Sequence, residues 1–175
     1  MTKTNIQLVE FAKSKVGCGY VFGATGQIIT EALIQSFAQG NPAQYSAEYI
    51  VRSRKWIGRE SYDCAGIIDA FCGINTTANN YYLRATVKGS SMANFPKTPG
   101  ALVHMDGHVG VYIGNGQVVE ARGVDYGVVI TSLSARPWVR WSLCYLVDYV
   151  SAEISAPVIV TPTPTIVVPR PINPY

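Results

Sequence analysis

The chain has 175 residues, which fits a single domain long enough to bury a hydrophobic core. Apolar residues make up 48% and charged residues 14% of the sequence, a composition that excludes a disordered chain. The formal charge of +3 is too small to indicate nucleic-acid binding, and it fits at most a weak attraction to an anionic polymer.

The N-terminal segment MTKTNIQLVEFAKSKVG has the pattern of an amphipathic helix. Its apolar positions recur at roughly helical spacing, at Ile6, Val9, Phe11, Ala12 and Val16. Gly17 and Gly19 end the predicted helix. The segment lacks the apolar core of a secretory signal, and no apolar stretch approaches the roughly 20 residues that span a bilayer. We therefore expect a protein made in the cytoplasm, without a signal peptide or a transmembrane segment.

The chain has four cysteines, Cys18, Cys64, Cys72 and Cys144, and none belongs to a C-x-x-C pair. Because there are only two histidines, a zinc site is not expected, and we predict neither a metal nor a cofactor. The number of cysteines would allow disulfides, although the chain is no short cysteine-dense scaffold. All except Cys64 are interpreted as small buried apolar residues.

Two helices and a basic run are predicted in the segment 28–58. Apolar residues at helical spacing predict a helix from Ile28 to Ala38, which Gly40-Asn41-Pro42 ends. A second, short helix is predicted through Tyr45, Tyr49 and Ile50. The basic residues that follow surround Trp56: Arg52, Arg54, Lys55 and Arg59. We interpret this run as a solvated face, with a surface that binds a polymer or gates a substrate as the alternative.

A third helix is predicted from Asp63 to Gly73, and after it the period of the apolar residues changes. Alternating apolar residues predict one strand over 108–113 and a partner strand over 118–121, joined by a glycine-rich turn. Further strands are predicted at 127–131 and 143–150. Helices followed by antiparallel strands indicate an α+β fold, with N-terminal helices packed on a C-terminal antiparallel sheet.

The composition changes again near the C-terminus, where the prolines cluster from Pro157 onward. Their density forbids a helix and favours an extended chain. We therefore predict one domain over 1–152 and a proline-rich linker or tail over 153–175, which could lead to a binding module.

Cys64 is a candidate nucleophile because Asp63, a good N-cap residue, places it in the first turn of the predicted helix. The amide groups and the positive dipole end of a helix favour a thiolate and can hold an oxyanion. Ala65 and Gly66 leave the approach to the sulfur open. A purely structural cysteine at a helix start is the alternative.

A nucleophilic cysteine also needs a base, and His104 and His108 are the two histidines of the chain. His108 begins the predicted strand and is followed by Gly110, which would leave space beside its ring. His104 precedes the predicted loop and is interpreted as a loop or edge residue. We therefore predict His108 as the base.

Glu120 is a candidate for orienting His108, and its assignment depends on the turn between the two strands. If the loop comprises Gly114-Asn115-Gly116, His108 and Glu120 lie on one face of the sheet as diagonal neighbours. A two-residue Asn115-Gly116 turn would place Glu120 on the opposite face. An exposed strand glutamate is then the alternative.

The two motifs YDCAGIIDAFCG and GHVGVYIGNGQVVEARG resemble the NlpC-type peptidoglycan endopeptidases, papain-like cysteine peptidases of bacteria and phages. The resemblance covers about 6–149. It implies a papain-like fold, Cys64 as the nucleophile, His108 as the base, and Glu120 as the polar residue twelve positions later that orients the base. Many relatives have a histidine at this third position and a serine where Ala65 stands.

The resemblance also implies binding roles for two residues. Tyr20, in a loop similar to the family's Y-x-[WF]-G-G-x pattern, would contact the oxyanion or the substrate, and Asp63 would recognise a free amine of the substrate. The segment 28–58 is longer than the corresponding link in many relatives and resembles an insertion that caps the cleft.

The implied activity is hydrolysis of a peptidoglycan stem peptide at the γ-D-glutamyl–diamino acid bond. An N-acetylmuramoyl-L-alanine amidase or an acyl or amide transferase could use the same Cys-His pair, and a non-catalytic wall-binding module is the third alternative. The expected partners are the stem peptide and an anionic wall polymer. We expect a monomer that reaches the wall without a cleaved signal, either released as a phage-type lysin is or delivered by another export route.

Overall fold

The structure of the protein, a computed structural model, describes residues 2–150. The linker or tail expected at 153–175 lies outside the described residues, as does the predicted domain end at 152. The described α-helices are α1 (Asn5–Ser14), α2 (Glu31–Gly40), α3 (Ala47–Ser53), α4 (Gly66–Cys72) and α5 (Ala78–Arg84). Short 3-10 helices are found at η1 (Arg54–Trp56), η2 (Met92–Asn94) and η3 (Leu133–Ala135). None of the described helices is long and apolar enough to cross a membrane.

The strands form two sheets. The small sheet has the spatial order β1 (Gly19–Tyr20), β3 (Glu60–Tyr62) and β2 (Thr25–Ile28). The main sheet has the order β4 (Lys88–Gly89), β9 (Arg140–Ser142), β5 (Leu102–Met105), β6 (His108–Gly114), β7 (Gln117–Gly123) and β8 (Gly127–Ser132). All neighbours in the main sheet are antiparallel, so the predicted α+β class is confirmed.

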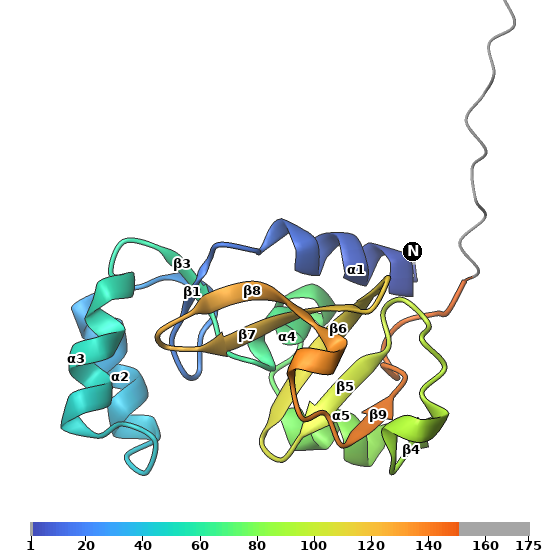
Figure 1. Ribbon diagram of the computed structural model, residues 1–175. Helices are drawn as coiled ribbons and strands as arrows, with labels where there is room; N and C mark the ends of the chain where they lie inside the picture. The colour runs from blue at the N-terminus through green and yellow to red at the C-terminus, as the bar shows by residue number, and fades with distance from the viewer. Residues whose placement is uncertain (1, 151–175) are drawn as a thin grey trace, which may run out of the picture.

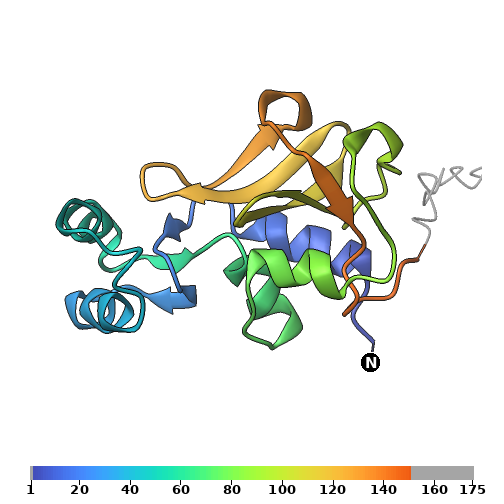
Figure 2. The same ribbon diagram turned by 90° about the horizontal axis from the view of Figure 1, so that it is seen from below.

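One face of the main sheet is covered by α1, α4 and α5, as the view from below shows (Figure 2). The strand alternation explains this arrangement, since Val109 and Val111 of β6 are buried in the core shared with these helices. Tyr112 lies on the other face, in a second core with Trp138 and Trp141. β6 is therefore buried on both faces, and this packing supports His108 at the start of the strand.

Each predicted helix is present in the structure, but its first and last residues differ from the prediction. Thr4 caps α1 by accepting a hydrogen bond from Gln7 N, and Asn41 follows α2 as its C-cap, at the predicted stop. The predicted helix at Asp63 begins later, because the chain from Asp63 to Ala65 forms a turn and α4 starts at Gly66.

The strand predicted at 143–150 is wrong. The strand at this end of the sheet is β9, and it ends at Ser142. Beyond it the backbone is held by a turn and by side chains: Val147 N donates to Cys144 O, and Cys144 N donates to the Tyr149 hydroxyl. Apolar residues are buried here without a ladder partner, which alternation alone does not distinguish from a strand.

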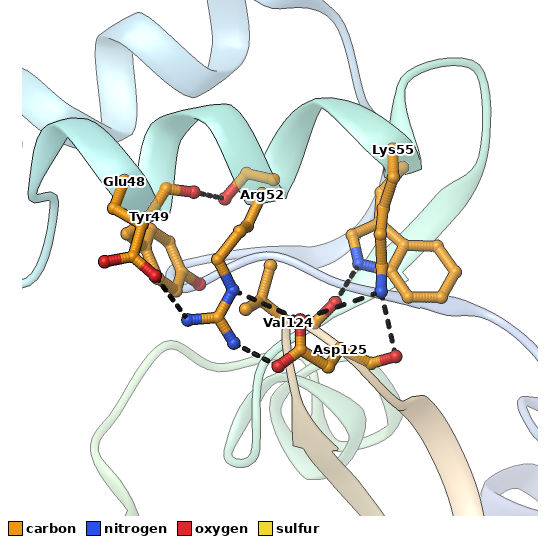
Figure 3. Close-up of polar contacts among 8 residues, drawn as sticks. Glu48, Tyr49, Arg52, Lys55, Val124 and Asp125 are labelled. Atoms are coloured by element: carbon orange, nitrogen blue, oxygen red, sulfur yellow. Dashed lines mark hydrogen bonds and ion pairs between the residues drawn. The ribbon is translucent and has the colours of Figure 1, made fainter.

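The pair α2–α3 projects to one side of the sheet (Figure 1) and has a core of its own, with Ile34, Tyr45 and Trp56 buried. Polar contacts join this pair to the loop between β7 and β8 (Figure 3). Arg52 forms an ion pair with the carboxylate of Asp125, and Lys55 Nζ donates to its backbone oxygen at 2.8 Å. The indole of Trp56 donates to Val124 O at 2.7 Å. Much of the predicted basic run is therefore paired within the molecule.

Candidate active site

The hairpin of β6 and β7 has a two-residue turn, because Gly114 pairs with Gln117. The turn residues Asn115 and Gly116 have φ angles of 51° and 71°, as a tight hairpin with two left-handed positions requires. The three-residue loop on which the assignment of Glu120 was based is therefore not formed.

A bulge restores the register that the two-residue turn would have changed. The pairing shifts between Tyr112 and Gly114, so that Val111 faces Val119 further along the hairpin. His108 and Glu120 consequently share one face of the sheet. The expectation that a two-residue turn directs Glu120 away was wrong, because one extra residue in β6 compensates for the missing loop residue.

Glu120 is fully buried and holds the ring of His108. Its Oε2 lies 2.7 Å from His108 Nε2, while Oε1 accepts a hydrogen bond of 2.7 Å from the Thr131 hydroxyl. Arg136 Nε lies 3.1 Å from the same Oε1. Desolvation raises the pKa of Glu120, but the hydrogen bonds from His108 and Thr131, together with the charge of Arg136, outweigh it and lower the pKa overall. Glu120 is therefore a carboxylate.

The His108 ring is also fixed by Trp138, whose indole stacks on it with 5.6 Å between ring centroids and 10° between the planes. Gly110 makes room for this indole, since a Cβ at that position would lie 3.1 Å from the Trp138 ring and 2.5 Å from Val118. The space that the sequence predicted beside Gly110 is thus occupied by Trp138.

Cys64 lies in the turn that leads into α4, and Asp63 organises this turn. The Asp63 carboxylate accepts hydrogen bonds from the backbone N–H of Ala65 and of Gly66, at 3.0 and 2.7 Å, and from that of Gly23 at 2.7 Å. Desolvation raises the pKa of Asp63, opposed by these three hydrogen bonds. A side chain at Gly66 would collide with Ala24 O. The close approach of this loop therefore requires glycine.

The sulfur of Cys64 contacts the backbone on both sides of His108. Sγ lies 3.6 Å from Gly107 O, and the N–H of Val109 is among the groups that lower the thiol pKa. Burial and the neighbouring Asp63 nevertheless raise the pKa of Cys64 to about 12. Burial therefore opposes the thiolate that a helix start favours, and a nucleophilic role for Cys64 would need a base that removes the thiol proton.

Tyr20, in β1, is near both of these residues. The pKa of its hydroxyl is raised by desolvation and by the neighbouring Cys64 and Asp63. The structure thus brings together the five residues that the sequence singled out: His108 and Glu120 lie on the main sheet, Tyr20 on β1 of the small sheet, and Asp63 and Cys64 in the segment that leads into α4.

A cleft of about 600 Å³ opens beside Cys64. Its lining comes from the turn that contains Cys64, the insertion, and the segment before and within α5: Phe22, Gly23, Phe37, Asn41, Gln44, Asp63, Cys64, Ala65, Asn75, Thr76, Thr77, Ala78, Asn79 and Gly107. Phe37, Asn41 and Gln44 belong to the segment 28–58. The residues from 2 to 150 contain no group of three or more side chains suited to a metal ion.

Comparison with known proteins identifies the family. The NlpC/P60 family model matches residues 51–147, more than half of the chain and the part that contains Cys64, His108 and Glu120. The chain belongs to the NlpC/P60 family. A comparison with curated protein sequences finds no match.

Solved structures agree on the fold of this NlpC/P60 domain. NlpC1 and NlpC2 from Trichomonas vaginalis superpose with TM-scores of 0.53 and 0.52 at 18% and 17% identity, over 80% of this chain in each case. The chain spans less than half of their length, 44% and 46%. The peptidoglycan hydrolase RipB from Mycobacterium tuberculosis has a TM-score of 0.50 at 18% identity, over 83% of this chain and 67% of its own. Likeness at these identities shows the fold.

His104 is not the loop or edge residue that the sequence predicted. It lies on β5, an inner strand of the NlpC/P60 sheet, and is fully buried with Nε2 2.9 Å from the Ser142 hydroxyl. Desolvation and the charge of Arg140 lower its pKa to about 3. The prediction failed because the strand at 102–105 was not foreseen.

The other cysteines are free thiols, with Cys144 buried and Cys18 and Cys72 half-buried. Sequence reasoning missed the residues that support the base, namely Thr131, Arg136 and Trp138. Thr131 could have been found, because it lies on the strand predicted at 127–131. It pairs with Val118, which lies two residues before Glu120 on β7 and therefore on the same face of the sheet. Arg136 and Trp138 follow η3 in a loop whose position no periodicity indicates.

Proposed function

We propose that this NlpC/P60 domain is a peptidoglycan hydrolase, a cysteine endopeptidase that cleaves an amide bond of the stem peptide. The observation that carries the proposal is the His108–Glu120 pair, with 2.7 Å between Nε2 and Oε2, placed beside the buried thiol of Cys64 at a cleft. Family membership supports it, as does the fold shared with RipB, which is itself a peptidoglycan hydrolase.

The tautomer of the His108 ring defines the first step. Because Nε2 faces the Glu120 carboxylate, it carries the hydrogen and Nδ1 keeps a lone pair. Nδ1 therefore accepts the proton of the Cys64 thiol as Sγ attacks the carbonyl carbon. Glu120 then stabilises the imidazolium, as the acidic member of a catalytic triad does.

The remaining steps use the same residues. The backbone N–H of Cys64, with the Tyr20 hydroxyl, would donate to the oxyanion of the tetrahedral intermediate. His108 returns its proton to the leaving amine, and the acyl group stays on Cys64 as a thioester. Water, deprotonated by His108, then releases the acid product and restores the thiol.

The scissile bond in this proposal is the γ-D-glutamyl–diamino acid bond, with Asp63 recognising a free amine at the end of the substrate. Asp63 is the one carboxylate among the cleft-lining residues, which supports this role. Its oxygens already accept three backbone hydrogen bonds, so an ammonium group would bind to a carboxylate that is held in place.

The test is digestion of defined peptidoglycan fragments by the wild type, Cys64→Ala and Cys18→Ala, with the products identified by mass spectrometry. We expect Cys64→Ala to lose cleavage and Cys18→Ala, which removes a half-buried thiol elsewhere, to retain it. Full activity of Cys64→Ala would refute the catalytic assignment. Cleavage between N-acetylmuramic acid and L-alanine would instead identify an amidase.

A further inference from the structure

The side chain of Asn79, in α5, contacts the turn that leads into the strand of His108. Its Oδ1 accepts a hydrogen bond from Gly107 N at 3.2 Å, and its Nδ2 donates to Asp106 Oδ1 at 3.2 Å. One amide therefore binds both residues of the two-residue turn between β5 and β6, where Met105 pairs with His108.

This turn forms part of the contact with the nucleophile. Gly107 has a φ of 69°, and its carbonyl oxygen lies 3.6 Å from Cys64 Sγ. The next residue is His108. The position of Gly107 thus determines both a direct contact of the thiol and the point from which the imidazole extends, while the side-chain hydrogen bonds of Asn79 join it to Asp106, Gly107 and Arg140.

Arg140 on β9 gives Asn79 a second anchor. Arg140 Nη2 donates to Asn79 Oδ1 at 3.2 Å, and the guanidinium lies 4.4 Å from the centre of the Tyr82 ring. Two donors on Oδ1 and a carboxylate at Nδ2 determine the orientation of the amide, because a flipped amide would place its NH₂ group against two donors. Asn79 is therefore held in one orientation between the sheet and the turn.

We propose that Asn79 is a positioning residue of the active site, which holds His108 against Cys64 by binding Asp106 and Gly107. The inference rests on the proposed function for its catalytic readout. A misplacement of reacting groups by about 1 Å can lower a rate by roughly a hundredfold, so a loosened turn should affect the chemical step more than substrate binding.

The neighbouring Asn80 provides a matched control. It lies on the same helix, and its Nδ2 donates to Thr76 Oγ1 at 3.2 Å rather than to the turn. We expect Asn79→Ala to lower kcat on a soluble stem peptide by about tenfold or more, with KM within about twofold. Asn80→Ala should keep both constants within about twofold of the wild type, and wild-type kcat in Asn79→Ala would overturn the proposal.

Exchanging the side chains of Asn79 and Asp106 tests the hydrogen bond between them. Asn79→Asp alone places a carboxylate against Asp106 and should lower kcat at least as much as Asn79→Ala. In the double variant Asn79→Asp/Asp106→Asn, the new carboxylate can accept from Gly107 N, from Arg140 and from the new amide. We expect the double variant to recover most of the lost kcat. If it is no better than Asn79→Asp alone, the proposal fails, including in the case that Asn79→Ala does not fold.

The alkylation rate of Cys64 by iodoacetamide, followed by mass spectrometry without substrate, separates this inference from the proposed function. We expect a slower rate in Asn79→Ala and recovery in the double variant, because His108 assists the loss of the thiol proton. If Asn79→Ala changes the alkylation rate but the wild type does not cleave the stem peptide, the proposed substrate is refuted and the positioning role stands. If the wild type cleaves the stem peptide but Asn79→Ala is alkylated at the wild-type rate, only the positioning role is refuted.

Discussion

At the scale of single residues, the two histidines of the chain show how neighbours decide chemistry. His104 is fully buried beside Arg140, and its pKa is lowered to about 3 by desolvation and this positive charge, so it stays neutral. His108 begins β6, and its Nε2 lies 2.7 Å from the Glu120 carboxylate. One ring is a structural hydrogen-bond partner, and the other is the candidate base.

Thr131→Val tests whether Glu120 acts as an ionised partner of His108. The Thr131 hydroxyl lowers the pKa of Glu120 by donating to the charged carboxylate, so its removal raises that pKa. Protonation of Glu120 then begins at a higher pH, and activity is lost earlier as the pH falls. We expect the acid limb of the kcat/KM profile to move to higher pH, with little change in activity near pH 8.

Ser132→Ala is the control for this substitution, because the Ser132 hydroxyl contacts Ser134 and not Glu120. Its acid limb should coincide with that of the wild type. An unchanged acid limb in Thr131→Val would show that the ionisation of Glu120 does not limit the reaction.

At the scale of elements, the segment 28–58 forms one wall of the cleft while remaining attached to the main sheet. Phe37, in α2, lines the cleft and packs beside Gly23 of the loop that contacts Asp63. On its other side the insertion holds the β7–β8 loop through Trp56 and Asp125. The insertion is thus fixed at two places, so its cleft-lining side chains form a stable surface.

Phe37→Ala measures what this wall contributes to substrate binding. Loss of the ring removes roughly 1–2 kcal/mol of apolar contact, which corresponds to a fall of about five- to thirtyfold in kcat/KM. We expect the loss to appear in KM, because Phe37 offers the cleft an apolar ring and no group that takes part in proton transfer. Steady-state kinetics on a soluble stem peptide checks this.

Gln35→Ala serves as the control, since Gln35 lies on the exposed side of α2 and bonds to Glu31. It should leave KM unchanged. If Phe37→Ala lowered kcat and left KM unchanged, the insertion would act on the chemical step rather than on binding.

At the scale of the whole molecule, the two ends of the described chain are joined. Thr4 pairs with Asp148, and the buried Asn5 binds segments far apart in sequence. Its Nδ2 donates to Pro99 O at 2.9 Å, and its Oδ1 accepts from Val150 N at 2.9 Å. α1 is thereby tied to the segment before β5 and to the last described residue.

Asn5→Ala should therefore destabilise the fold without changing the chemistry. The two side-chain hydrogen bonds to Pro99 O and from Val150 N are lost in a partly buried setting, which costs roughly 1–3 kcal/mol of unfolding free energy. Urea unfolding measures this change. Glu10→Ala, at an exposed position of α1 in a surface ion pair, should change the stability by less than about 0.5 kcal/mol. Equal stability of the two variants would contradict the role given to Asn5.

The sequence by itself indicated the α+β class and several of its helices and strands, and with the family resemblance it named the candidate site residues. Periodicity identified α1, α2, α3, β6, β7 and β8, because apolar residues recur along each of them at helical or strand spacing. The two motifs predict Cys64 and His108 as the candidate nucleophile and base, since one motif carries a cysteine at a predicted helix start and the other a histidine at a strand start. Short elements such as β1, β4 and β9 escaped prediction because two or three residues show no period.

Only the tertiary structure decided how these residues meet. The bulge in β6 keeps Glu120 on the face of His108 despite a two-residue turn, and a bulge leaves no pattern in apolar spacing. Burial beside Asp63, rather than the helix start, sets the pKa of Cys64, because desolvation depends on atoms from distant segments. Trp138, Arg136 and Asn79 also reach the site from distant parts of the sequence. Tertiary packing brings them there, and the local sequence around each residue does not indicate this position.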